Sequence, residues 1–354
     1  MVKIGLLGLP KSGKTTIFNA VTGSDAKIKD YISQKEKPNI ATIKVFDERL
    51  QYLSEIFQPQ KTIYSAIEYI DFMGLSEDDK KGELFSSKYL SDLKTVDALA
   101  FVLRNFELPG KQTDSVSELE IINNELLFSD LSVCENRINT IKKQNKRGVT
   151  SADLDFELKL MRKCHERLNA SKPLRQMDFN KEEQKILNSF QFLTQKPVMI
   201  IINESVDNFA SEESITKEMP NELTCVEIAG KFELELNELE EEERQMFMVE
   251  YGINDSAINK LTRVSYDTLG LITFFTVGDD EVRAWAIRKS STALQAADKV
   301  HTDLARGFIR AERFRISDLK EYGSINALKN NGKLYLEGKQ YVVRDGDVIK
   351  IRHN

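Results

Sequence analysis

One segment near the amino terminus limits the folds open to this chain: GLLGLPKSGKTTIFNA, at Gly5–Ala20. It follows a short apolar run, Val2–Leu7, that has the character of a buried strand, and it leads into a helical pattern. Its spacing fits G-x-x-x-x-G-K-[ST] through Gly8, Gly13, Lys14 and Thr15. A plain glycine-rich turn is the alternative. The order strand, loop, helix instead predicts a phosphate-binding loop that opens an α/β domain.

The chemistry of such a loop assigns a role to each of its parts. Successive backbone N–H groups point at phosphate oxygens, a lysine reaches the β- and γ-phosphates, and a hydroxyl binds Mg²⁺. In this chain the lysine is Lys14 and the hydroxyl belongs to Thr15. The residues expected to contact a nucleotide here are Gly8, Pro10, Lys11, Ser12, Gly13, Lys14, Thr15 and Thr16.

A nucleotide-hydrolysing site of this kind needs a second carboxylate near Mg²⁺, at the end of a strand. The apolar run AIEYID ends at Asp71, and Gly74 completes a D-x-x-G pattern. We expect Asp71 to contact Mg²⁺ through water and the Gly74 N–H to sense the γ-phosphate, so that Lys14, Asp71 and Gly74 carry catalysis. The alternative is an ordinary aspartate at a strand end. Leu75 stands where many switch GTPases have a water-orienting glutamine, so intrinsic hydrolysis is expected to be slow or organised by another group.

A base-reading motif is expected after a later strand. Asn203 ends the apolar run KPVMIIIN, at the place of the asparagine of N-K-x-D. Val206 occupies the position of the carboxylate that selects guanine, and Asp207 lies one residue further along. The residues expected to contact the base are Asn203, Glu204, Ala229, Gly230 and Lys231. The choice between ATP and GTP stays open.

A helical pattern separates the strand-like runs of the α/β domain. Apolar residues step by 4, 3, 4, 3 in 127–141 and again in 154–168, which predicts an antiparallel helical hairpin of coiled-coil type. Asn180 and Glu183 fit the capping box of a third helix. Strand-like runs separated by helical patterns flank this insertion and indicate a mostly parallel sheet. The hairpin serves either as a structural arm only or as an arm that reaches a partner.

From Leu271 onward the pattern is that of a separate α+β module. ITFFTVG and VRAWAI are expected to pair as strands, and Asp345-Gly346-Asp347 signals a tight turn. Between Arg283 and Arg315 eight Lys or Arg residues stand against three acids, in a chain whose net charge is −6. This local excess favours an RNA-binding surface, although the module could instead only pack on the α/β domain.

The sequence argues against a disulfide-rich protein, a cysteine-based metal site, a membrane-spanning protein and a secreted protein. The three cysteines, Cys134, Cys164 and Cys225, are scattered and show no disulfide or metal-binding spacing. No apolar run approaches the length of a membrane span, and no signal peptide is visible. No catalytic role is assigned to any of the three histidines. The acidic stretch 237–252 is interpreted as a solvated face. We therefore expect a cytoplasmic chain with no membrane partner.

The motifs together resemble the YchF group of the Obg-like P-loop NTPases (TRAFAC class), of which this chain looks like a divergent member. The resemblance rests on GLPKSGKTTIFNA, on KPN before DERL, on YIDFMGL, on the helical insertion, and on EVRAWAI, HTDLARGFIRAE and YVVRDGDVIKIRHN. It implies a G domain in 1–112 and 196–268, an inserted coiled-coil arm in 113–195 and a TGS domain in 271–354. It also implies Mg²⁺-dependent hydrolysis of ATP, often in preference to GTP, and association with ribosomes. Leu75 fits the family's hydrophobic-substituted class.

Three residues depart from the family pattern at the nucleotide site. Lys11 replaces an asparagine linked in related NTPases to a bound potassium ion, and Val206 replaces a glutamate. Lys35 aligns with the switch threonine that completes the Mg²⁺ shell, with Ser33 as the nearest hydroxyl. The Lys11 ammonium is hypothesised to take the place of potassium, against the alternative of an exposed surface lysine. These three substitutions leave two hypotheses of function open. The chain is either an ATPase or GTPase switch, or a nucleotide-binding adaptor with little hydrolysis.

Overall fold

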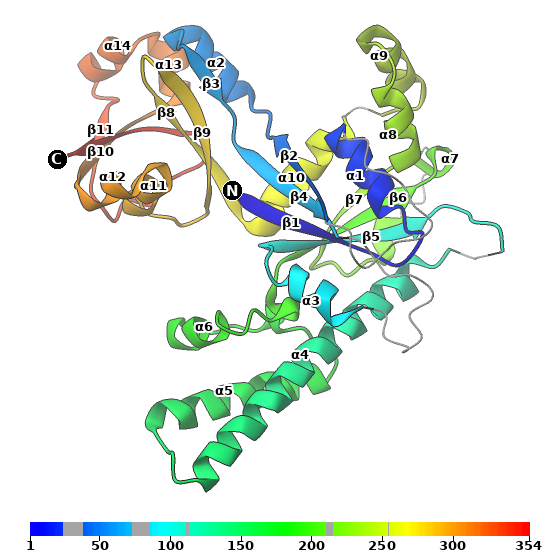
Figure 1. Ribbon diagram of the computed structural model, residues 1–354. Coiled ribbons are helices and arrows are strands. Elements are labelled where there is room, and N and C mark those ends of the chain that lie inside the picture. The colour runs from blue at the N-terminus through cyan, green and yellow to red at the C-terminus, as the bar shows by residue number, and fades with distance from the viewer. Residues whose placement is uncertain (24–37, 73–84, 111–112, 210–214, 254) are drawn as a thin grey trace. The chain divides into compact units, whose positions relative to one another are not determined.

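The structure, a computed structural model, describes residues 1–23, 38–72, 85–110, 113–209, 215–253 and 255–354 (Figure 1). These residues group into two compact units. The amino-terminal unit comprises Val2–Ala41 and Glu68–Leu261, and the carboxyl-terminal unit comprises Met1, Thr42–Ile67 and Thr262–Asn354. The predicted boundaries of the G domain, the arm and the TGS domain stay a proposal.

A six-stranded sheet forms the centre of the amino-terminal unit, in the order β2-β4-β1-β5-β6-β7. Its strands are β1 (Val2–Leu7), β2 (Asn39–Lys44), β4 (Ala66–Asp71), β5 (Ala98–Asn105), β6 (Val198–Glu204) and β7 (Thr224–Ile228). The pairs β1–β5, β5–β6 and β6–β7 are parallel, which confirms the predicted mostly parallel sheet. β5 and β6 are almost continuously apolar and buried, as strands covered on both faces are.

Helices connect these strands and extend from them. They are α1 (Lys14–Thr22), α3 (Ser87–Leu93), α4 (Ser115–Lys146), α5 (Ala152–Asn169), α6 (Lys181–Leu187), α7 (Val206–Phe209), α8 (Gly230–Asn237), α9 (Glu241–Glu250) and α10 (Ala257–Leu269). The described residues also form the short 3₁₀ turns η1 (Leu174–Gln176), η2 (Leu193–Gln195) and η3 (Ile215–Glu218). No helix in the described part of the chain is long and apolar enough to cross a membrane.

The predicted helical insertion is present as the antiparallel pair α4 and α5 (Figure 1). Ser151 caps α5 by accepting the Leu154 N–H, and Asn180 and Glu183 form the predicted capping box of α6. At the seam, a cluster that includes Leu127, Ile138, Leu160, Met161 and Leu168 packs the two helices together. The spacing of apolar residues therefore predicted the helix faces correctly, because a 4, 3 step keeps one stripe of each helix facing its partner.

Asp130 of α4 joins the arm to the base of the unit. Its side chain is fully buried, and its two oxygens accept hydrogen bonds from the Leu193 N–H at 3.0 Å and from the Thr194 N–H and hydroxyl, both at 2.7 Å. Burial raises the pKa of this carboxyl, while these hydrogen bonds lower it. The carboxylate caps η2 and fixes where α4 meets the chain that leads into β6.

The carboxyl-terminal unit contains a second six-stranded sheet, in the order β11-β10-β12-β8-β9-β3. Its strands are β3 (Lys61–Ile63), β8 (Leu271–Val277), β9 (Glu281–Arg288), β10 (Phe308–Arg315), β11 (Tyr335–Glu337) and β12 (Asp347–His353). Its helices are α2 (Glu48–Phe57), α11 (Ala293–Val300), α12 (Thr302–Arg306), α13 (Ile316–Tyr322) and α14 (Ile325–Asn330). The predicted pairing of ITFFTVG with VRAWAI is confirmed as the antiparallel pair β8–β9.

The tight turn predicted at Asp345-Gly346-Asp347 is confirmed, although it does not join two paired strands. A turn forms there, with the Asp347 N–H donating to the Arg344 carbonyl at 3.1 Å. The strand after it, however, pairs with β10 and β8 rather than with the segment before the turn. Val342 forms only an isolated bridge with Thr292. The turn therefore feeds β12 into a sheet whose other members come from earlier in the chain.

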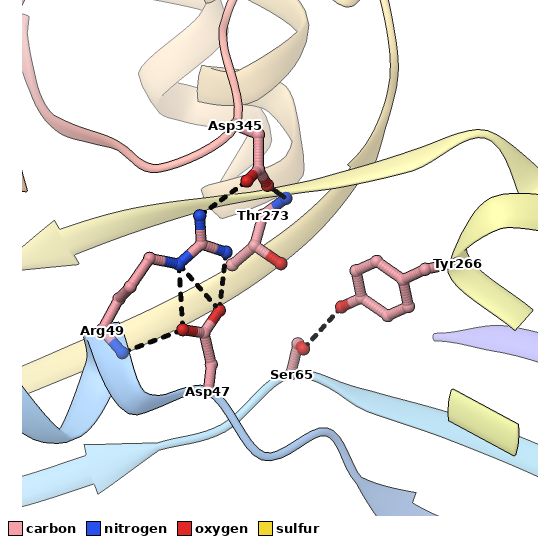
Figure 2. A network of polar contacts seen from close by, with 6 residues as sticks. All are labelled: Asp47, Arg49, Ser65, Tyr266, Thr273 and Asp345. Carbon is pink, nitrogen blue, oxygen red and sulfur yellow. Dashed lines mark hydrogen bonds and ion pairs between the residues drawn. The ribbon is translucent and has the colours of Figure 1, made fainter. Parts of the chain in front are cut away.

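Residues 42–67 belong to the carboxyl-terminal unit even though they are distant from it in sequence. β3 pairs in parallel with β9, and Leu50 and Leu53 of α2 pack in its core. Figure 2 shows the polar contacts of this segment: Arg49 bonds to Asp345 at 2.6 Å and to Asp47. Asp345 also accepts the Thr273 N–H at 2.8 Å, and the hydroxyls of Ser65 and Tyr266 lie 2.7 Å apart.

Candidate functional site

The glycine-rich loop between β1 and α1 has the backbone that its sequence requires. The Ser12 N–H donates to the Leu9 carbonyl at 3.1 Å, and α1 begins directly after Gly13, whose φ of 84° is left-handed. A Cβ on Gly8 would overlap the Val102 carbonyl, and a Cβ on Gly13 would overlap the Asn203 amide. Close contacts therefore require a glycine at both positions, and the left-handed φ of Gly13 is a second reason for glycine there.

Lys14 lies inside the loop rather than on the surface. Its side chain is 9% exposed, and its ammonium donates to the Gly8 carbonyl at 3.0 Å. Burial lowers the pKa of Lys14, and the negative charge of Asp71 partly offsets that effect. The hydrogen bond to Gly8 thus holds the ammonium against the glycine-rich loop. A P-loop lysine contacts phosphate oxygens from this position.

Thr15 and Asp71 meet beside the loop, as the paired motifs predict. The Thr15 hydroxyl donates to Asp71 Oδ2 at 2.8 Å, and Asn39 Nδ2 donates to the same oxygen at 3.3 Å. Asp71 is 1% exposed; burial raises its pKa, while the charge of Lys14 and the two hydrogen bonds lower it. A hydroxyl and a carboxylate side by side are hard oxygen donors, so the residues present fit Mg²⁺.

Asn203 joins the phosphate loop to the AGK loop. Its amide nitrogen donates to the Ser12 carbonyl at 3.0 Å, and its amide oxygen accepts the Gly230 N–H at 3.2 Å. The side chain is 3% exposed, and a Cβ on Gly230 would come within 2.9 Å of its oxygen. Asn203 therefore positions two loops, and its amide is used at both ends in this arrangement.

The remaining residues of the predicted base site lie around Asn203 with different degrees of exposure. Glu204 is buried and accepts a hydrogen bond from Asn105 Nδ2 at 2.7 Å. Val206 begins α7, with Asp207 exposed beside it. Ala229 is buried, whereas the Lys231 side chain is 89% exposed and pairs with Glu235 at 3.9 Å.

The structure thus gathers most of the predicted residues and leaves others apart. Gly8, Ser12, Gly13, Lys14, Thr15, Asp71, Asn203 and Gly230 are joined directly or through one another. Pro10 and Thr16 are half-buried members of the loop and of α1, and Lys11 is exposed with a φ of 66°. Gly74, Leu75, Ser33 and Lys35 lie outside the described residues.

Two polar residues of the site were not among those predicted from sequence. Asn39 contacts Asp71, and Asn105 contacts Glu204. Each lies at an end of a strand of the parallel sheet, next to a predicted site residue. Among the described residues, no cluster of three or more His, Cys, Asp or Glu side chains could hold a metal ion. A P-loop site needs none, because phosphate and water oxygens supply the other ligands.

Comparison with known proteins agrees with this geometry along the whole chain. A family model described as "50S ribosome-binding GTPase" matches residues 3–137, and one described as "Protein of unknown function (DUF933)", the YchF-GTPase C-terminal family, matches residues 271–354. The "Ribosome-binding ATPase YchF" of Bacillus subtilis (strain 168) is 38% identical, over 99% of this chain and 98% of that protein. The protein of the same description from Escherichia coli O157:H7 is 35% identical, with 99% of each chain covered.

A solved structure extends the agreement to three dimensions. The Schizosaccharomyces pombe YchF GTPase superposes with a TM-score of 0.84 at 30% identity, covering 99% of this chain and 97% of that one. The helical insertion and the carboxyl-terminal module are therefore part of a shared whole-chain architecture. The chain belongs to the YchF family of Obg-like P-loop NTPases.

Proposed function

We propose that this chain is a Mg²⁺-dependent nucleoside triphosphatase of low intrinsic rate that hydrolyses ATP and associates with ribosomes in the cytoplasm. The observation that carries the proposal is the buried pair Thr15–Asp71 beside the enclosed Lys14 ammonium. Burial disfavours the charged form of the Lys14 side chain. A lysine at this position is therefore better explained by a functional role than by the stability of the fold. A triphosphate in the loop supplies the negative charge that compensates the ammonium.

Thr15 and Asp71 would hold Mg²⁺, the hydroxyl directly and the carboxylate through water. The ion, when bound, neutralises charge on the β- and γ-phosphate oxygens. Lys14 adds a second positive charge, and backbone N–H groups of the loop would orient the phosphates; Pro10 has none, and that of Ser12 is bonded to Leu9. Catalysis on this account is positioning plus charge stabilisation. No general base is assigned, and with Leu75 in place of a polar side chain the intrinsic rate is expected to be low.

The base preference follows from Val206. A guanine-selecting site accepts hydrogen bonds from the base with a carboxylate, and valine cannot accept them. The relatives from Bacillus subtilis and Escherichia coli are described as ATPases, which supports the same preference. Titrating fluorescently labelled ATP and GTP against the purified chain tests this directly. We expect tighter ATP binding or weak discrimination, and strong selectivity for GTP would contradict it.

The proposed partner is the ribosome, contacted through RNA by the basic carboxyl-terminal module and by the helical arm. The segment 283–315 carries the charge excess, and in it the Arg283 guanidinium lies 3.9 Å from the Trp285 ring centroid. A cation held over an aromatic ring suits a surface that binds phosphate and stacks bases. Co-sedimentation with ribosomes over a salt series tests the idea, because phosphate contacts predict a steep loss of binding with salt.

A further inference from the structure

The strongest feature outside the nucleotide site is the exposed side of α9. Met246 is 72% exposed, Val249 is 80% exposed and Phe247 is 41% exposed. No residue of this helix is buried. Figure 1 shows α9 beyond α8, on the side of α8 away from the strands of the amino-terminal sheet. Large apolar side chains that are this exposed and adjacent on one helix are uncommon on a monomer surface unless they bind something.

The attachment of α9 uses a different side of the helix. Arg244 and Met248 are half-buried, and the Tyr251 ring lies 4.8 Å from that of Phe232 in α8. Positions 244, 248 and 251 follow the i, i+4, i+7 spacing of one helix face. Met246 and Val249 fall between them, on another face. Among the residues that the structure describes, none buries that face.

Acidic residues surround these apolar side chains. Glu241, Glu242, Glu243 and Glu250 are all exposed, and Arg244 is the one basic residue within α9. Interpreting the segment as a solvated acidic face accounts for the glutamates but not for Met246 and Val249. We define the α9 surface as Met246 and Val249, which share one face of the helix, together with these four glutamates. Its charge repels nucleic acid and complements a cationic partner.

We propose that the α9 surface is a docking site for a cationic amphipathic segment of a protein partner. Apolar side chains of the partner would cover Met246 and Val249, and its lysine or arginine residues would meet the glutamates. This division matches ordinary interface anatomy, in which an apolar centre supplies affinity and a charged rim supplies rate and orientation. The inference stands on the α9 surface alone and does not depend on hydrolysis or on ribosome binding.

The helix that supports this surface, α8, is held at both ends and along its length. α8 packs on α1, and Asn237 at its end donates to the Ala20 carbonyl at 2.8 Å. At its start, the Gly230 N–H is bonded to Asn203. Glu233 of α8 is 5% exposed and accepts the Ala257 N–H at 3.1 Å. Preorganised support of this kind lowers the entropy lost when a partner binds.

The test uses the full-length protein and a defined probe. The probe is a fluorescein-labelled amphipathic helix of leucine and lysine, compared with a lysine and serine peptide of equal charge. We expect the wild type to bind the leucine-containing probe more tightly, and the double variant Met246→Gln/Val249→Gln to weaken that binding by about tenfold. Val149→Gln, an exposed apolar site in the turn between α4 and α5, is the matched control and should change affinity by less than about twofold.

A second variant separates charge from apolar contact. Glu242→Gln/Glu243→Gln should weaken probe binding at low salt and flatten its salt dependence. The proposal is overturned if the wild type does not bind the probe, if the double glutamine variant binds it as well as the wild type, or if both peptides bind equally. It is also overturned if the wild type self-associates in sedimentation and the double glutamine variant does not, because the surface then joins two copies of this chain.

Discussion

Thr15 and Asp71 are 56 residues apart in sequence, and the hydroxyl of the first donates to the carboxylate of the second at 2.8 Å. Thr15 lies in the first turn of α1, which follows β1, and Asp71 ends β4, the neighbour of β1 in the sheet. The sheet order thus places a hydroxyl and a carboxylate together beside the phosphate loop. Because Asp71 is buried, its ionised form depends on Lys14, Thr15 and Asn39.

Asp71→Asn is predicted to lower the rate of Mg²⁺-dependent ATP hydrolysis by about 10²–10³-fold, because it removes a charge that organises the site. Single-turnover kinetics with saturating enzyme measure this effect. Glu68→Gln is the control, since Glu68 lies on the same strand and pairs with Lys3 at 3.3 Å instead. A wild-type rate in Asp71→Asn would remove Asp71 from the proposed mechanism.

Asp130→Ala is predicted to lower the free energy of unfolding by about 3 kcal/mol, because the N–H groups of Leu193 and Thr194 lose their buried acceptor. Urea unfolding followed by circular dichroism measures it. Glu135→Ala, on the same helix with a side chain that is 55% exposed, should change stability little. An unchanged midpoint in Asp130→Ala would show that this cap contributes nothing.

The same residue predicts a pH dependence. Burial raises the folded-state pKa of Asp130 above that of the unfolded chain, so the folded protein binds more protons in the interval between the two. The stability gained by protonation is therefore fully present below the unfolded pKa, about 3.9, and is lost as pH rises through the folded pKa. The difference in unfolding free energy between wild type and Asp130→Ala should shrink as pH rises from acid toward neutral. A difference that grows with pH would reverse the sign.

Val206→Asp is predicted to shift the preference toward GTP by at least tenfold in the ratio of dissociation constants. A carboxylate at this position accepts hydrogen bonds from guanine N–H groups, and each charged hydrogen bond contributes about 1.5–3 kcal/mol. Competition binding with labelled nucleotides measures the ratio. Asp207→Asn should leave it unchanged, and if that variant instead abolished GTP binding, Asp207 would be the base-reading carboxylate.

Lys11 is exposed, as the alternative of a surface lysine expects. If its ammonium takes the place of potassium, hydrolysis by the wild type should be insensitive to potassium, and Lys11→Asn should make it sensitive. Lys11 is exposed and has a φ of 66°, a conformation that asparagine adopts more readily than lysine, so the variant should fold normally. Hydrolysis rates across a K⁺ titration, with Na⁺ replacing K⁺ at constant ionic strength, decide the matter. A wild type already stimulated by K⁺ would rule out the substitution of a lysine for the ion.

The sequence was most informative where a motif is continuous. Gly8, Gly13, Lys14 and Thr15 occupy fixed spacings, so their common loop could be predicted before any long-range contact was known. Asp71 could be predicted as a site residue because it ends an apolar strand-like run, and the carboxyl ends of parallel strands lie at one edge of the sheet. The seam of α4 and α5 followed from apolar periodicity.

Contacts between distant segments could not be predicted in this way. Arg49 and Asp345 are 296 residues apart, and neither belongs to a pattern that points to the other. The pairing of β3 with β9 likewise depends on a register that no local sequence encodes. Asn39 and Asn105 are small polar residues at strand ends, a common arrangement, and their contacts with Asp71 and Glu204 follow only from the order of strands.

We propose that the loop around Lys14 hydrolyses ATP slowly by itself and serves a ribosome-associated switch. The most direct measurement is single-turnover hydrolysis of ATP by the full-length chain, with and without purified ribosomes and at several K⁺ concentrations. We expect slow Mg²⁺-dependent turnover alone, a faster rate with ribosomes, and a rate about 10²–10³-fold lower in Asp71→Asn. A rate at background in every condition would contradict it and would identify the chain as a nucleotide-binding adaptor.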